Sequence, residues 1–105
     1  MNDVNYILQK IKEIILGKEP TAKIYLYGSR ARGLSLPDSD WDLLILLKKE
    51  KITLEIENNI TYPLYDLEFE IGEVISPMVY SEFEWNSKYK ITPFYANVMG
   101  DGKLL

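Results

Sequence analysis

Two aspartates stand one residue apart in front of a short apolar run, and their types and spacing suit a divalent cation. Residues 43–47 are all Leu or Ile and are followed by charged residues, which predicts a buried strand rather than a helix. Alternate side chains of a strand point to the same face, so Asp40 and Asp42 would lie on one side. Mg²⁺ takes one or two carboxylates and completes its shell with water and phosphate oxygens. The alternative is that both aspartates are solubility charges at a strand edge.

The segment 28–33, Gly-Ser-Arg-Ala-Arg-Gly, predicts a site for an anion close to these aspartates. It follows residues 24–27, whose alternation predicts a strand. Gly28 allows backbone N–H groups to approach an anion, and a helix that starts at Ser29 would add its positive dipole end. The Ser29 hydroxyl can cap such a helix or donate to a phosphate oxygen. The alternative for the segment is a solvated turn.

Two arginines lie in the same segment, Arg30 and Arg32. Residues two apart on a helical element cannot face the same way. We therefore expect Arg32 to face a bound nucleotide and Arg30 to face solvent.

Together these residues resemble the active-site signature of the DNA polymerase beta-like nucleotidyltransferases, and specifically the minimal nucleotidyltransferase domains of bacteria and archaea. The resemblance rests on Gly28-Ser29-x-x-Arg32-Gly33, followed by Ser39-Asp40-x-Asp42 and an apolar strand. By this resemblance, Gly28 and Ser29 hold the triphosphate, and Asp40 and Asp42 are ligands of catalytic Mg²⁺. The fold that it implies is the palm-like core of that family.

The resemblance also implies an activity and a partner. The activity is Mg²⁺-dependent transfer of a nucleoside monophosphate from a nucleoside triphosphate, with ATP expected, to an acceptor hydroxyl. Domains of this family often pair with a small helical partner of the HEPN type, as in toxin–antitoxin modules whose transferase adenylylates its partner. We therefore expect a HEPN-type protein as acceptor. A free-standing aminoglycoside-type transferase is disfavoured, because those enzymes carry an additional helical domain.

One departure from the family concerns a third carboxylate, which its members supply from the next core strand. In this chain that strand is expected at about 73–81, and Ser76-Pro77 stands where the acid would lie. Glu73, at the strand entrance, is the remaining candidate for a third metal ligand, and a surface charge is its simpler interpretation. Asp66 and Glu68 fall in a segment that predicts helix. The departure bears on turnover and leaves the prediction of nucleotide and metal binding unchanged.

Composition excludes several other classes of chemistry. The 105 residues include no cysteine and no histidine, which excludes disulfides, thiol nucleophiles, Ser-His-Asp schemes and His-based metal sites. The formal net charge of -4 argues against extended contact with nucleic acid. No segment approaches the roughly 20 apolar residues that span a bilayer. The acidic start of the chain is no signal peptide, so we expect a cytoplasmic protein.

The remaining pattern predicts the elements that position these residues. Apolar residues at helical spacing predict a first helix from Asn2 or Asp3 to Gly17. A second helix is expected over 53–71, with a kink or break near Thr61-Tyr62, because a proline such as Pro63 inside a helix costs about 3 kcal/mol. The other elements expected before residue 81 are a strand at 22–28, a short helix or turn at 29–36, a strand at 41–48 and a strand at 73–81, in which Pro77 favours an edge position.

The end of the chain is rich in aromatic residues, namely Phe83, Trp85, Tyr89, Phe94 and Tyr95. We favour their packing onto the sheet, because aromatic residues dominate small cores. A partner-binding surface is the alternative. Thr92-Pro93 predicts the start of a short helix at about 93–99 that stops at Gly100, and residues 104–105 predict a final strand.

This order of elements predicts an α+β (or α/β) fold, with a small mixed β-sheet covered by helices mainly on one face. The length is that of one domain, so we expect a single minimal nucleotidyltransferase domain over 1–105. Three functional classes remain open. They are an active transferase, a nucleotide-binding or partner-binding subunit that lacks turnover, and a plain structural module.

Overall fold

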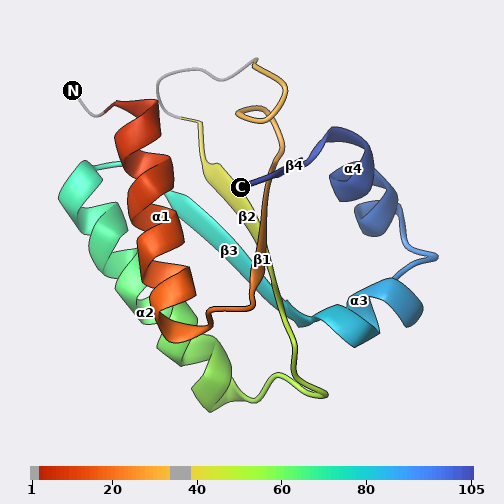
Figure 1. The fold of residues 1–105 in the computed structure, drawn as a ribbon. Coiled ribbons are helices and arrows are strands. Elements are labelled where there is room, and N and C mark those ends of the chain that lie inside the picture. Colours follow the sequence, from red (N-terminus) through yellow and green to blue (C-terminus); the bar gives the residue numbers. More distant parts are fainter. Residues whose placement is uncertain (1–2, 34–38) are drawn as a thin grey trace.

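The computed structural model describes residues 3–33 and 39–105, and that part of the chain forms four helices and four strands (Figure 1). In chain order they are α1 (Val4–Lys18), β1 (Lys23–Tyr27), β2 (Trp41–Leu47), α2 (Leu54–Ile71), β3 (Ile75–Ser81), α3 (Glu82–Ser87), α4 (Pro93–Asp101) and β4 (Lys103–Leu104). No helix in these two described ranges has both the length and the apolar character needed to cross a bilayer.

The strands form one mixed sheet in the order β3-β2-β1-β4. β1 pairs antiparallel with β2 and β4, whereas β2 and β3 run parallel. This sheet confirms the α+β fold class. Pro77 lies on β3, which is an edge strand, as its missing N–H group requires.

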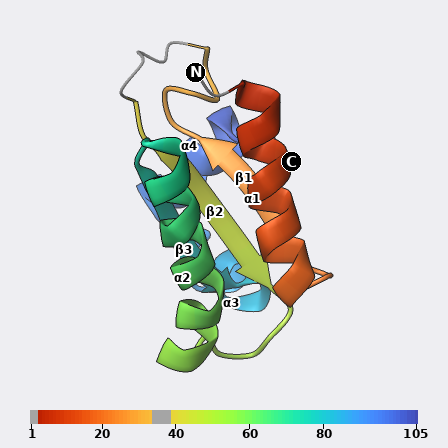
Figure 2. The same ribbon diagram turned by 90° about the vertical axis from the view of Figure 1, so that its left-hand side faces the viewer.

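The two faces of the sheet carry different covers (Figures 1 and 2). The long helices α1 and α2 lie on one face, where they bury alternate residues of β2 such as Leu43 and Ile45. On the other face, Leu44 and Leu46 of the same strand pack with the aromatic residues of the C-terminal segment, including Trp85. Because β2 is buried on both faces, its position is fixed, and so is the position of the acidic residues at its start.

The sequence predicted a kink or break near Thr61-Tyr62 in the helix over 53–71, and the structure shows no break there. α2 runs unbroken from Leu54 to Ile71, with Thr53 as its N-cap and Gly72 as its C-cap. Its inner side buries a continuous stripe that includes Ile60, Leu64 and Leu67. Burial of such side chains contributes about 1.5–3 kcal/mol each, which outweighs the loss of one hydrogen bond at the proline.

The C-terminal segment contains a helix that we did not predict, α3. Its sequence signal was present, since Ser81 caps it by accepting from the N–H of Glu84 at 3.2 Å, in the Ser-x-x-Glu pattern of a helix start. The helix predicted at 93–99 is α4, with Thr92 as N-cap, but it continues through Gly100 and ends before Gly102. The predicted packing of aromatic residues holds for Trp85, which is fully buried, and not for Phe83, which is 75% exposed.

Candidate functional site

β2 places Asp42 as its second residue, on the face that also carries Leu44 and Leu46. In the sheet register Asp42 stands opposite Tyr27 of β1 and beside Ser76 of β3. Asp40 precedes the strand, and its Oδ2 atom accepts a hydrogen bond from Ser76 Oγ at 3.3 Å. The two aspartates therefore flank one serine at the same end of the sheet.

Gly28 brings the turn after β1 against this end of the sheet. Its φ of 77° lies in the left-handed region, and its carbonyl oxygen accepts from the N–H groups of Ala31 and Arg32 at 3.1 and 3.2 Å. A Cβ atom on residue 28 would overlap the Oδ2 atom of Asp42, so the missing side chain is what allows this close approach. Residues 29–33 form a turn and not the start of a helix. Residues 34–36 of the predicted element lie outside the described residues.

Only 9% of the Arg30 side chain is exposed, so our expectation that it faces solvent is wrong. Its Nε and Nη2 atoms donate to the carbonyl oxygen of Ser39 at 3.0 and 2.8 Å, and Nη2 also pairs with Oε1 of Glu73 at 2.9 Å. The guanidinium lies over the ring of Trp41, with Cζ 4.1 Å from the ring centroid. The prediction failed because it assumed a helix, whereas a turn lets Arg30 reach back to the start of β2.

Arg30, Trp41 and Glu73 thus form a network that positions the backbone on both sides of Asp40. Trp41 Nε1 donates to the same Glu73 oxygen at 3.0 Å, which closes the network. The Trp41 N–H group donates to the carbonyl oxygen of Val74 at 2.8 Å, and Ser39 is held by Arg30. Asp40 therefore lies between two anchored peptide groups.

Arg32 lies on the surface, where its Nη1 atom is 3.3 Å from Oδ2 of Asp101 at the end of α4. The two side chains are 45% and 46% exposed. An exposed ion pair of this kind contributes about 0–1 kcal/mol to stability. Arg32 can therefore exchange Asp101 for another anion at low cost.

Glu73 does not join the two aspartates. Its carboxylate binds Arg30 and the indole of Trp41, and Trp41 packs on the α1 and α2 side of the sheet, away from Asp42. Within residues 3–33 and 39–105, no group of three His, Cys, Asp or Glu residues is placed to hold a metal ion. The position beside Asp42 on β3 is occupied by Ser76.

The electrostatics of this end of the sheet suit a cation. Burial, and then the charge of Asp40, raise the pKa of Asp42 above its ordinary value. Burial, and then the charge of Asp42, raise the pKa of Tyr27 to about 12, so the phenol stays protonated. Two carboxylates with a hydroxyl beside them are hard oxygen donors, and they fit Mg²⁺ with its remaining ligands drawn from water and phosphate. A cation there would offset the repulsion that raises the pKa of Asp42.

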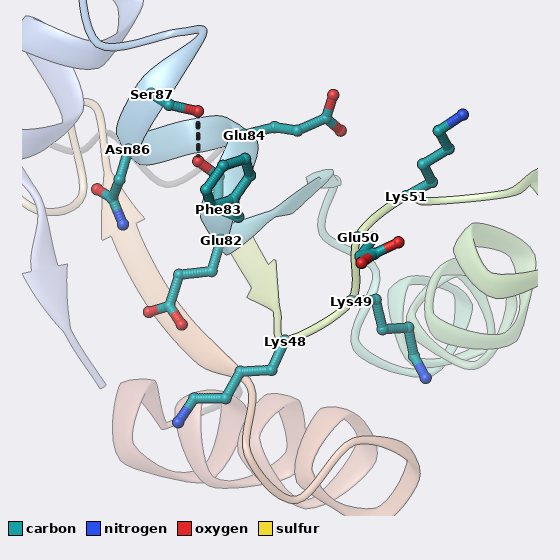
Figure 3. A pocket seen from close by; sticks show the side chains of 9 residues that line it. All are labelled: Lys48, Lys49, Glu50, Lys51, Glu82, Phe83, Glu84, Asn86 and Ser87. Atoms are coloured by element: carbon teal, nitrogen blue, oxygen red, sulfur yellow. Dashed lines mark hydrogen bonds between the residues drawn. The ribbon is translucent and has the colours of Figure 1, made fainter.

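A cavity of about 840 Å³ lies elsewhere, at the far end of β2 from Asp42 (Figure 3). Its lining comes from residues 48–51 after β2 and from α3, and it combines lysines and glutamates with the exposed ring of Phe83. None of the residues from the 28–33 or 39–42 segments lines it. The cavity is therefore separate from the candidate site.

Trp41 and Glu73 have roles that were not predicted from the sequence. One signal was present, because a strand that points two aspartates to one face must point the residue between them to the other. The side chain of Trp41 therefore had to point away from the acidic pair. No local pattern, however, connects it to Glu73, which lies 32 residues further along the chain.

Comparison with known proteins identifies the family. The nucleotidyltransferase domain family matches residues 8–95 of the chain. A curated relative, the inactive non-canonical poly(A) RNA polymerase protein Trf4-2 of Drosophila melanogaster, is 34% identical over 55 residues. That alignment covers 50% of this chain and 14% of the relative, so the chain spans a small part of that protein's length.

Two solved structures share the fold. One is a toxin-antitoxin crystallised with AMP-PNP, with a TM-score of 0.66 and 20% identity over 91% of this chain and 69% of the other. The second is a mutant of the toxin-antitoxin MntA-HpeT, with a TM-score of 0.58 and 18% identity over 100% of this chain and 72% of the other. With a family match over most of its length, this chain belongs to the nucleotidyltransferase domain family.

Proposed function

We propose that this chain is a Mg²⁺-dependent nucleotidyltransferase that moves a nucleoside monophosphate, from ATP or another nucleoside triphosphate, to an acceptor hydroxyl. The observation that carries the proposal is the approach of the Gly28 turn to Asp42, with Asp40 at the same end of the sheet. The phosphate-binding and metal-binding groups of a transferase must lie close together, because a cation held by the carboxylates would neutralise charge on the phosphates.

Each residue of the site has a stated role in this reaction. Gly28 and Ser29 hold the triphosphate, and Arg32 contributes positive charge from the surface. Asp40 and Asp42 hold Mg²⁺, which supplies charge neutralisation on the phosphate oxygens when bound. The acceptor oxygen gives up its proton to water and forms a bond to the α-phosphorus, while the bond to pyrophosphate breaks and pyrophosphate leaves. Positioning of the two reactants supplies much of the rate.

For the acceptor, we propose a hydroxyl on a helical partner protein of the HEPN type. The two structural neighbours are toxin-antitoxin proteins, which supports a protein partner. The described residues hold no second substrate domain, since the four helices are used to cover the sheet. A partner would have to bring the acceptor to the aspartates.

A second candidate is a nucleotide-binding subunit without turnover. Ser76 in place of a third acid favours it, and the curated relative is described as inactive. The two candidates agree on nucleotide binding and differ on transfer.

The test uses ATP labelled at the α-phosphate with Mg²⁺, in the presence and absence of a HEPN-type protein. Transfer of label that is lost in Asp40→Ala and in Asp42→Ala supports the transferase. Nucleotide binding without transfer supports the second candidate. Absence of Mg²⁺-dependent nucleotide binding contradicts both.

A further inference from the structure

The outer side of α2 carries an exposed line of aromatic side chains. Tyr62, Tyr65 and Phe69 are 60%, 45% and 94% exposed, and their spacing of three and four residues places them along one side of the helix. We call these three residues the aromatic stripe. The opposite side of α2 is buried against the sheet and α1, which is the layer seen behind and beside it in Figure 2. The aromatic stripe therefore does not contribute to the hydrophobic core.

The charges that α2 itself carries around the aromatic stripe have one sign. Every charged residue of α2 is acidic, and Glu55, Asp66 and Glu70 are exposed. In the described part of the chain, none of these three carboxylates pairs with a lysine or arginine. Like charges on a helix repel one another unless a cation from elsewhere lies between them. The surface is thus complementary to a basic partner.

A small cavity lies at the C-terminal end of the stripe. It has a volume of about 350 Å³ and is lined by Glu68, Phe69, Gly72, Glu73 and Val74. Its apolar walls, Phe69 and Val74, are exposed. Its two carboxylates already have partners, since Glu68 Oε2 accepts from the Ile75 N–H group at 2.8 Å and Glu73 binds Arg30 and Trp41. The apolar stem of a lysine or arginine matches these walls, and the exposed carboxylates of Asp66 and Glu70 on α2 remain for its cation.

We propose that the aromatic stripe and this cavity form a docking surface for an amphipathic helix of a partner protein, with an apolar line flanked by Lys and Arg. An amphipathic helix binds such a surface through apolar side chains spaced three and four residues apart, which would pack against the aromatic stripe. A second copy of this chain would oppose acidic residues to acidic residues, which is unfavourable. Nucleic acid is disfavoured by the same sign of charge.

The surface lies next to the candidate active site, because Glu73 lines the cavity and also binds Arg30 of the turn. A helix docked there would hold its protein beside that end of the sheet. This last step rests on the proposed function, since it assigns to the partner the acceptor hydroxyl. The docking itself does not depend on nucleotide chemistry.

The test measures binding of a fluorescently labelled synthetic helix with a leucine line flanked by lysine and arginine, at about 0.15 M ionic strength. We expect saturable binding to the wild-type chain and none of a matched helix with glutamate in place of the basic residues. The double substitution Tyr65→Ser with Phe69→Ser should weaken binding by about tenfold, as loss of aromatic anchors does. Asp66→Asn with Glu70→Gln should weaken binding of the basic helix by a smaller factor. Added salt should abolish this difference from the wild-type chain.

The control variant is Ile91→Ser, which changes a side chain that is 92% exposed and lies outside α2. It should bind the basic helix as the wild-type chain does. Equal binding by the stripe variant, or equal binding of the glutamate helix, would overturn the proposal, as would a dimer in sedimentation that the stripe variant abolishes. Because no nucleotide is present, Asp42→Asn should bind the helix normally even if transfer is never observed.

Discussion

Asp42 is a carboxylate whose burial and acidic neighbour both raise its pKa in the folded protein. A folded-state pKa above the unfolded value means that the folded chain binds the proton more tightly. The free energy of unfolding therefore falls as the pH rises from the ordinary Asp pKa, about 3.9, through the raised value. At neutral pH, ionised Asp42 costs stability unless a cation offsets the charge.

Asp42→Asn should consequently stabilise the metal-free protein at neutral pH and leave stability nearly unchanged at pH values below the ordinary Asp pKa. Mg²⁺ should raise the melting temperature of the wild-type chain and not that of the variant, because a ligand stabilises only the state that binds it. Thermal unfolding in EDTA and in Mg²⁺ across this pH range measures both effects. Asp66→Asn, at an exposed position of α2, is the control. The interpretation is contradicted if Asp42→Asn is less stable than the wild-type chain at neutral pH. It is also contradicted if Mg²⁺ raises the melting temperature of Asp42→Asn and of the wild-type chain equally.

The two arginines of the turn should separate in their effects. Arg30→Lys keeps the charge but cannot reproduce the paired bonds to Ser39 or the contact over Trp41, so it should lower the melting temperature and weaken nucleotide binding together. Arg32→Ala removes an exposed ion pair and should leave the melting temperature unchanged while it weakens nucleotide binding. Thermal unfolding and nucleotide titration measure the two properties. A loss of stability in Arg32→Ala that equals the loss in Arg30→Lys would contradict the assignment.

At the scale of single residues, the sequence predicted features that depend on residues close together in the chain. Strand alternation predicted Asp40 and Asp42 on one face, and the structure places both at one end of the sheet with Asp40 just before β2. Gly28 was predicted to let N–H groups approach an anion, and the structure shows its close approach to Asp42. The position of Arg30 could not be predicted in this way. Its partners lie 9 and 43 residues away, and only the finished fold brings them together.

At the scale of elements, the turn after β1 offers a matched pair of glycines. Gly28 and Gly33 have φ values of 77° and 72°, so alanine at either position costs about 1–2 kcal/mol for the left-handed conformation. A Cβ atom at 28 would also overlap Asp42, whereas at 33 it meets nothing within 4 Å. Gly28→Ala should therefore abolish Mg²⁺-dependent nucleotide binding, and Gly33→Ala should lose stability alone. Calorimetric titration of both variants checks this, and equal retention of binding would count against the site.

The register of β3 against β2 permits a second substitution at this scale. Ser76→Asp would add a third carboxylate beside Asp40 and Asp42. It should lower the melting temperature in EDTA through repulsion of like charges and increase the shift produced by Mg²⁺. Ser76→Asn, of the same shape without the charge, should do neither. An unchanged Mg²⁺ shift in Ser76→Asp would place the metal elsewhere.

Helices and strands were predicted correctly where one local sequence pattern is clear. They were missed where tertiary packing determines the structure. β2 and the edge strand β3 followed from the apolar run and from Pro77. The unbroken α2 was not predicted, because the buried stripe that holds it against the sheet depends on the tertiary contacts of α1. α3 was missed although its capping pattern was readable, since the aromatic residues around it obscured the helical period.

On the scale of the whole molecule, the candidate metal ligands and the network that positions them lie on different faces of the sheet. Asp42 and Ser76 lie on the face of the short C-terminal helices, whereas Arg30, Trp41 and Glu73 connect the same end of the sheet to the side of α1 and α2. The proposed docking surface lies on that second side. A partner on α2 would therefore leave the face of the aspartates open to nucleotide.

The central claim is that Asp40 and Asp42 hold one metal ion beside a triphosphate on the Gly28 turn. A crystal structure with Mg²⁺ and a non-hydrolysable ATP analogue tests it most directly. We predict one metal ion with an oxygen of each aspartate at about 2.0–2.1 Å and the remaining ligands from phosphate and water. Carboxylates that point away from the metal, or a nucleotide bound in the cavity beside Lys48 instead, would contradict the account.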